Sequence, residues 1–128
     1  MKLLLVCFSV LLLFCSCVVE PTTGPDTAVG PPPSSFFMNQ NYPNPFTDTT
    51  RVKYGVPSST TLSIVVYDQF REEVRTIVSN NSHAPGQYIA VWDGKDRRGF
   101  KVKSGTYYLE MKGYVPQAAI IFVTAVKQ

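Results

Sequence analysis

Three cysteines, one histidine and a pair of aspartates are the side chains of this 128-residue sequence that could carry catalytic or metal chemistry. Cys7, Cys15 and Cys17 all fall within the first 17 residues, so the rest of the chain has no thiol for catalysis, metal binding or disulfide formation. His83 lies between Asn/Ser and Ala-Pro residues, without a framing nucleophile. We expect it to be a solvated loop residue and not a catalytic base.

The aspartate pair, Asp93 and Asp96, flanks Gly94 in a turn-rich segment that superficially resembles a calcium loop. The remaining ligands of an EF-hand are missing, and aspartates that accept hydrogen bonds from their own turn explain the pair better. No glycine-rich phosphate loop is present. We therefore predict no catalytic residue, no metal site and no cofactor, and a protein that is not an enzyme.

Of the three thiols, that of Cys17 lies in a sequence pattern that predicts a modification. Leu3 to Phe14 is almost continuously apolar after the basic Lys2, yet at about 1.5 Å per residue it is too short to cross a bilayer core of about 30 Å. This pattern is typical of a secretory signal. The following Cys15-Ser16-Cys17 resembles a bacterial lipobox. We expect residues 1–16 to be a lipoprotein signal peptide and Cys17 to carry a lipid; the alternative is an ordinary signal that leaves a free thiol.

Residues 17–35 contain five prolines with Thr, Gly and Ser between them and show no apolar period. Such a composition favours an extended, partly polyproline chain that cannot form a core. We interpret it as a tether that holds the following domain away from a membrane. The expected location is the bacterial cell envelope, at the outer membrane, with the membrane as a partner through the N-terminal lipid.

The segment from residue 36 to residue 128 shows the period-two alternation of apolar residues that is typical of β-strands. The predicted strands are Thr49–Val56, Thr60–Asp68, Gln87–Asp93, Thr106–Gly113 and Ala118–Lys127, with weaker strands at Glu73–Ser79 and Phe100–Val102. Turn residues separate them, and no helical period is present. We therefore predict one all-β domain, an antiparallel β-sandwich, over residues 36–128.

Alternation also predicts which side chains face the core. Tyr88 and Trp92 share one face of a strand, which makes Trp92 a core residue rather than a ligand platform. Tyr107 is expected to point inward and Tyr108 outward. In the last strand Ile120, Phe122 and Thr124 share a face, and this apolar strand is expected at a sheet edge, where a partner could add a strand.

Two turn-rich segments that flank the predicted strands resemble a known family. Tyr42-Pro43-Asn44-Pro45-Phe46, and Trp92-Asp93-Gly94 through Gly99 to Gly105-Thr106-Tyr107, together resemble the immunoglobulin-like domain of flagellar hook-capping proteins and the related sorting domains of type IX secretion cargo. The resemblance implies an immunoglobulin-like sandwich of about seven strands. The two prolines give up backbone N–H groups where the chain rounds the end of the sandwich, and Tyr42 and Phe46 are expected to close the open end of the core.

Val65 to Asp68, followed by Glu73-Val74, resembles the second strand and turn of the same family. Many relatives carry a glycine in this turn, whereas Gln69 to Glu72 contains none. The geometry of this turn is therefore not predicted by the resemblance.

These observations favour a non-enzymatic cell-envelope lipoprotein that displays its sandwich for contacts with a protein or a surface, the partner and oligomeric state being open. The net charge of +3, on scattered basic residues, argues against a nucleic-acid partner. One alternative is a type IX secretion sorting or export module, which a lipid anchor disfavours because it would hold the chain back. The other is a carbohydrate-binding domain, which needs an aromatic or polar cleft.

Overall fold

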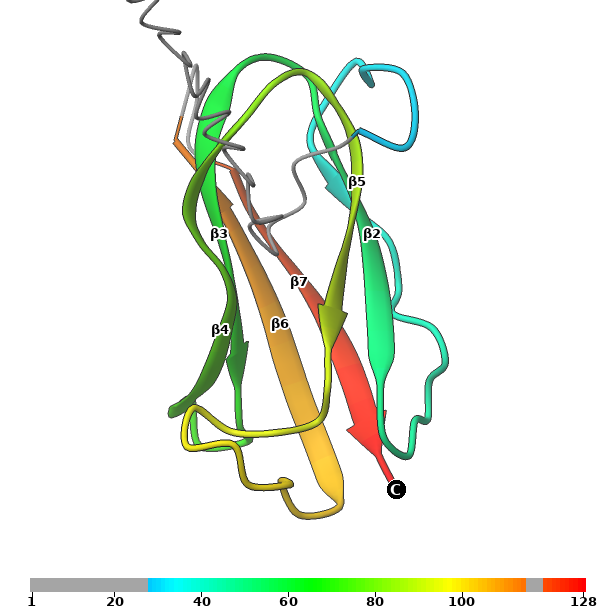
Figure 1. The fold of residues 1–128 in the computed structure, drawn as a ribbon, viewed down its shortest axis with the longest axis vertical. Coiled ribbons are helices and arrows are strands. Elements are labelled where there is room, and N and C mark those ends of the chain that lie inside the picture. Colours follow the sequence, from blue (N-terminus) through cyan, green and yellow to red (C-terminus); the bar gives the residue numbers. More distant parts are fainter. Residues whose placement is uncertain (1–27, 115–118) are drawn as a thin grey trace, which may run out of the picture.

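The alternating segments form two antiparallel sheets that pack face to face as a sandwich (Figure 1). The computed structural model describes residues 28–114 and 119–128. Its strands are β1 (Phe37–Met38), β2 (Thr50–Val56), β3 (Thr60–Tyr67), β4 (Glu73–His83), β5 (Gly86–Trp92), β6 (Gly105–Gly113) and β7 (Ala119–Lys127). The predicted fold class, an all-β immunoglobulin-like sandwich of about seven strands, is confirmed.

The first sheet has the strand order β1-β2-β5 and the second has the order β4-β3-β6-β7. All neighbouring strands are antiparallel, and β2 pairs with β5 from Thr50 opposite Trp92 to Val56 opposite Gly86. The β3–β4 pairing contains register shifts, whereas β6 and β7 pair without interruption. The second sheet therefore presents a broad outer face with β7 at one edge.

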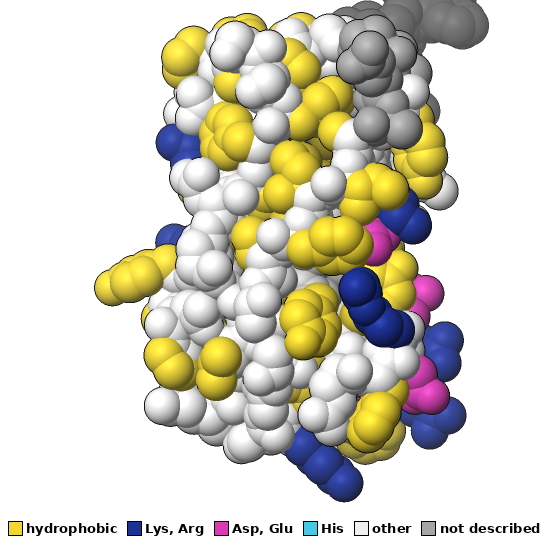
Figure 2. All heavy atoms as spheres, turned by 180° about the vertical axis from the view of Figure 1, so that it is seen from behind, with side chains coloured by type: hydrophobic (Ala, Val, Ile, Leu, Met, Phe, Trp, Pro, Cys, Tyr) yellow, Lys and Arg dark blue, Asp and Glu magenta, His cyan; other side chains and the backbone are white. Residues whose placement is uncertain are grey.

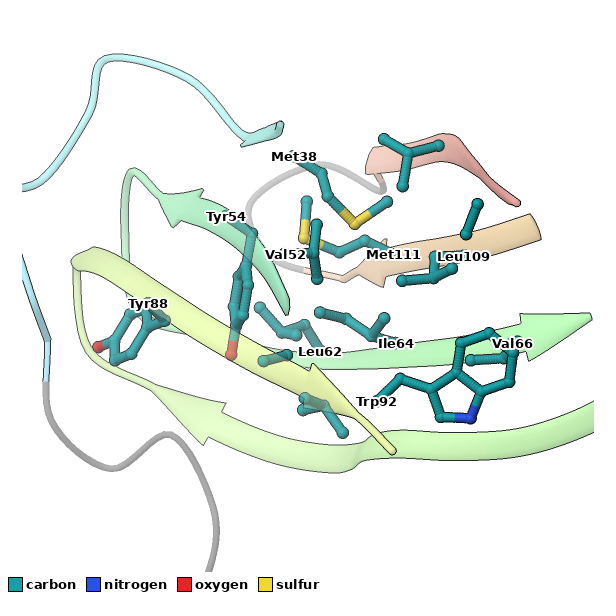
Figure 3. Close-up of a cluster of buried hydrophobic side chains, with 14 of the residues drawn as sticks. Met38, Val52, Tyr54, Leu62, Ile64, Val66, Tyr88, Trp92, Leu109 and Met111 are labelled. Carbon is teal, nitrogen blue, oxygen red and sulfur yellow. The ribbon is translucent and has the colours of Figure 1, made fainter. Parts of the chain in front are cut away.

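The core lies between the sheets and is built from one side of each long strand. In β3, buried residues alternate with half-buried ones along the whole strand, so one face is shared by Leu62, Ile64 and Val66. Figure 3 shows these side chains pointing toward Trp92, Leu109 and Met111 from the other strands. Period-two alternation therefore decides which apolar side chains leave water, which is the main favourable term in folding.

Two weaker strand predictions need correction. Phe100–Val102 is not a strand; the segment contributes only an isolated antiparallel bridge between Lys95 and Lys101. β4 runs four residues beyond the predicted end at Ser79, through Asn80 at φ 44°. β1 was not predicted, because two residues are too short to show a period.

The last strand lies at a sheet edge, as predicted, and the face that Ile120, Phe122 and Thr124 share is the exposed one. Ile120 and Phe122 are exposed by 57% and 45%, while Val123 and Ala125 point into the core. Both faces of β7 are apolar, so alternation alone does not distinguish them. The exposed set becomes part of the outer face described below.

The end of the proline-rich segment that the structure describes lies against β5. The Val29 N–H donates to the Gln87 carbonyl oxygen at 2.7 Å, and the Pro31 carbonyl accepts from the Gln87 side chain at 3.0 Å. The chain thus enters the sandwich beside the first residues of β5. The domain boundary at residue 36 and the tether stay predictions.

Candidate interaction surface

The Asn41–Phe46 segment covers the C-terminal part of the β7 edge. The Asn44 side chain accepts from Val126 N–H at 2.8 Å and donates to the Thr124 carbonyl at 3.2 Å. Phe46 then forms a parallel bridge with Lys127. These bonds occupy edge groups that a partner strand would need, so strand addition to this half of β7 is blocked.

The two aromatic residues of this segment behave differently. Phe46 is buried and packs against Trp92, with ring centroids 5.3 Å apart. Tyr42 is 76% exposed, so the expectation that it closes the core is wrong. The peptide bonds before Pro43 and Pro45 are both cis. Asn41, buried, donates to the Thr50 hydroxyl at 2.9 Å and fixes the start of the segment.

Trp92 lies in the core, as alternation predicts, and also anchors the loop that follows it. Its ring is 1% exposed and meets Tyr107 edge-on at 5.2 Å. The indole N–H donates to the Lys95 carbonyl at 2.9 Å. Gly94 and Gly99 of this loop, and Gly105 at the start of β6, have positive φ, a conformation that glycine adopts more readily than other residues.

Two five-residue loops at this end of the sandwich have the same hydrogen bonds. In the first Asp loop (Asp68–Glu72), the Asp68 carboxylate accepts from the N–H groups of Phe70 and Glu72, at 2.8 and 2.9 Å. In the second Asp loop (Asp96–Phe100), the Asp96 carboxylate accepts from Arg98 and Phe100, at 2.9 and 3.0 Å. Asp96 thus caps its own turn, which is the structural role expected of the aspartates.

The fourth position of both Asp loops has positive φ. It is occupied by Gly99 at φ 86° in the second loop and by Arg71 at φ 66° in the first. Arg71 was not singled out from the sequence; the only signal was the missing glycine of this turn. A non-glycine residue in this region is uncommon and directs attention to its side chain.

The Arg71 guanidinium lies over two rings on the outer face of the second sheet. Its central carbon is 5.7 Å from the ring centre of Tyr108 and 5.2 Å from that of Phe122. We call these three residues the aromatic patch. Tyr108 is half-buried and outward, as predicted, and Phe122 belongs to the exposed row of β7. Figure 2 shows apolar side chains spread over this side of the molecule, with most of the charged side chains along one margin.

A shallow hollow of about 260 Å³ lies on the same sheet, over β3, β4 and β6. One of its two acidic groups, Glu110, is buried and forms an ion pair of 2.9 Å with Lys112. The hydrogen bond to Glu110 raises the pKa of the Lys112 ammonium. Each charge of this pair therefore already has a partner of opposite sign.

His83 is not the solvated loop residue that we expected. It ends β4, is 4% exposed, and its Nε2 lies 2.8 Å from the Tyr54 hydroxyl. Its Nδ1 lies 2.9 Å from the Asn81 carbonyl, and its ring meets Tyr88 edge-on. Burial, followed by the nearby Tyr88, raises the pKa of Tyr54. The register of the β3–β4 hairpin brings His83 into the core, which its polar sequence neighbours did not indicate.

Within residues 28–114 and 119–128, no group of three His, Cys, Asp or Glu side chains is close enough to hold a metal ion. No helix in this described part is long and apolar enough to cross a membrane. Cys17 and the expected signal peptide lie outside the described residues. Lipidation therefore stays a prediction.

The fold and its loops define an immunoglobulin-like β-sandwich. Residues 39–115, more than half of the chain, match the FlgD Ig-like domain family, and the chain belongs to this family, whose members are structural and non-catalytic. The resemblance to hook-capping proteins is thus confirmed for the sandwich.

Two solved structures are similar to the chain. FlgD from P. aeruginosa matches with 26% identity and a TM-score of 0.52, covering 62% of this chain and 62% of that one. PorZ of Porphyromonas gingivalis, described as an essential bacterial surface component of the type IX secretion system, matches with 15% identity and a TM-score of 0.50. That match covers 74% of this chain and 12% of PorZ, and it shows the fold alone. A comparison with curated proteins finds no match.

Proposed function

We propose that this protein is a lipid-anchored, non-enzymatic component of the bacterial cell envelope whose sandwich binds a protein partner. The observation that carries the binding role is the outer face of the second sheet. There Arg71 lies over Tyr108 and Phe122, and exposed Ile120 continues the apolar row. Protein interfaces are enriched in aromatic residues and arginine.

The anchor is proposed from the sequence, at Cys17. Stable membrane attachment takes more than one lipid chain or a second signal, which lipoprotein modification of a cysteine would supply. The test is to label cells that produce the full chain with a fatty acid and to fractionate them. We expect label and membrane retention in the wild type and in Cys15→Ser, and loss of both in Cys17→Ser. Equal labelling in Cys17→Ser would contradict the anchor.

The similarity to PorZ, whose description places it at the type IX secretion system, favours a second candidate: a sorting or export module. To distinguish the two, residues 18–128 are fused behind a secreted reporter in a bacterium with a working type IX system. The proposed function predicts that the reporter stays in the periplasm. Delivery to the surface that depends on the type IX system would support the sorting role instead.

A further inference from the structure

We propose that the aromatic patch is a receptor site for a carboxylate side chain, carried by a partner protein beside an apolar residue. Arg71 would bind the carboxylate, while Phe122 and Ile120 would contact the apolar neighbour. This inference rests on the proposed function and names the chemistry of its partner.

The backbone provides the first argument. The two Asp loops share the same hydrogen bonds, yet only the second has glycine at its positive-φ position. Gly99 satisfies the turn without a side chain, whereas Arg71 holds φ at 66° with one. Residues held in sparsely populated conformations concentrate at functional sites. The turn itself does not require arginine, so its side chain is the feature to explain.

The guanidinium provides the second argument. It is stacked on Tyr108 and Phe122, which restricts its motion before any partner arrives. Among the described residues, no hydrogen bond or ion pair involves its N–H groups. A planar guanidinium presents N–H groups in a fixed fork that matches a carboxylate. Preorganisation of this kind lowers the entropy cost of binding.

The surroundings select the class of partner. Ile120 and Phe122 are exposed by 57% and 45% and follow one another along the outer face of β7. The next basic group of the face, Lys112, is already paired with Glu110 at 2.9 Å. Among the described residues on this outer face, Arg71 is therefore the cation without an ion pair beside the apolar row, and its guanidinium fits a single carboxylate with an apolar neighbour. A polyanion, such as an acidic polysaccharide or an anionic membrane, would need several unpaired cations.

The test uses the full chain, purified in detergent, against arrays of matched peptides. Each peptide places Asp or Glu beside Leu or Phe, and its control replaces the acid by Asn or Gln. We expect acidic peptides to bind at least about tenfold more tightly than their amide controls, because hydrogen bonds between charged groups are stronger than those between a charged and a neutral group. Arg71→Gly and Arg71→Gln should abolish this difference, and Arg71→Lys should reduce it.

The matched control is Arg98→Gln, which removes the same charge from the second Asp loop, and it should bind as the wild type does. The Arg71→Gly variant copies the second loop, so it tests the side chain without disturbing the turn. Equal binding of acidic and amide peptides, or binding that survives Arg71→Gln, would overturn the inference. So would binding confined to heparin or to vesicles of anionic lipid. These outcomes are separate from the lipid-labelling and reporter experiments, which test the proposed function.

Discussion

The two Asp loops form the same hydrogen-bonded turn with different residues. Their comparison distinguishes the residues that the turn requires from a residue that is available for a role at the surface. In both, the backbone N–H of the aspartate donates to the carbonyl four residues later, Asp68 to Glu72 at 3.0 Å and Asp96 to Phe100 at 2.8 Å. In both, the fourth residue donates back to the aspartate carbonyl. At that fourth position, which has positive φ in both loops, one loop carries Arg71 and the other carries Gly99.

The loops also differ in what holds them. The second is tied to the core, because Trp92 donates to the Lys95 carbonyl, and Arg97 N–H donates to Val74 at 2.9 Å. The first is held from outside, by the Arg71 side chain over the rings of β6 and β7. A buried anchor stabilises mainly the fold, whereas an exposed anchor is also available to a partner.

The largest expected effect comes from removing the buried anchor. Trp92→Ala should lower the free energy of unfolding by about 3–5 kcal/mol, because it empties a large core site and releases the second loop. Chemical denaturation of the purified protein measures this loss. Trp92→Phe is the control: it keeps part of the ring packing but loses the hydrogen bond to the Lys95 carbonyl. A loss under about 1 kcal/mol in Trp92→Ala would mean that the ring contributes little to the core.

Exchanging the fourth residue of the second loop should have the next largest effect. Gly99→Arg places at the fourth position of this loop the residue that the first loop carries there. A Cβ atom added at this position, where φ is 86°, meets nothing within 4 Å, so the expected cost is conformational, about 1–2 kcal/mol of unfolding free energy. Gly99→Ala should cost the same amount in the same denaturation assay. Unchanged stability in both variants would show that positive φ carries no penalty here.

The sequence predicted the parts of this fold that depend on local periodicity. Five strands lie within one or two residues of their predicted bounds, because alternation over seven or more residues is a strong signal. Local periodicity does not predict burial where tertiary contacts decide which side chains face the core. His83 is buried by the register of a hairpin, and β7 has two apolar faces between which only the sandwich can choose.

Only one feature of the candidate site was visible in the sequence. The absence of glycine between Gln69 and Glu72 was visible in the sequence, but the rings that Arg71 reaches lie 37 and 51 residues further along the chain. No local pattern connects these positions. The stacking depends on the β3–β4 turn and the β6–β7 pairing being brought together by the sheet.

The third prediction uses the charge of the first Asp loop. Burial, followed by the Asp68 carboxylate, raises the pKa of Tyr107. Asp68→Asn should lower this pKa toward the ordinary value near 10, since it removes the charge and keeps an acceptor for the turn. Asp96→Asn is the matched control and should leave Tyr107 unchanged. NMR titration of ring-labelled tyrosine, with Tyr107→Phe for assignment, measures the shift.

The sign of the corresponding stability effect follows from the same shift. The fold favours the neutral Tyr107 phenol, so this contribution is fully present below the unfolded pKa near 10 and is lost as pH rises through the higher folded pKa. Asp68→Asn should make the alkaline loss smaller. Titration of Tyr107 that is the same in both Asn variants would show that Asp68 does not act on it.

The smallest effect is expected when the fourth residue of the first loop is replaced by the glycine that the second loop carries there. Arg71→Gly removes the stacking, worth about 0.5–1 kcal/mol per exposed pair, and relieves the positive-φ penalty of about 1–2 kcal/mol. The added flexibility of glycine in the unfolded chain offsets part of that relief. The unfolding free energy should therefore change by less than about 1 kcal/mol. Arg71→Ala loses the same stacking but keeps the penalty, so denaturation should show it to be less stable than Arg71→Gly. If the alanine variant is the more stable of the two, the first loop is not strained at this position, and the argument that its arginine is retained for a surface role loses its basis.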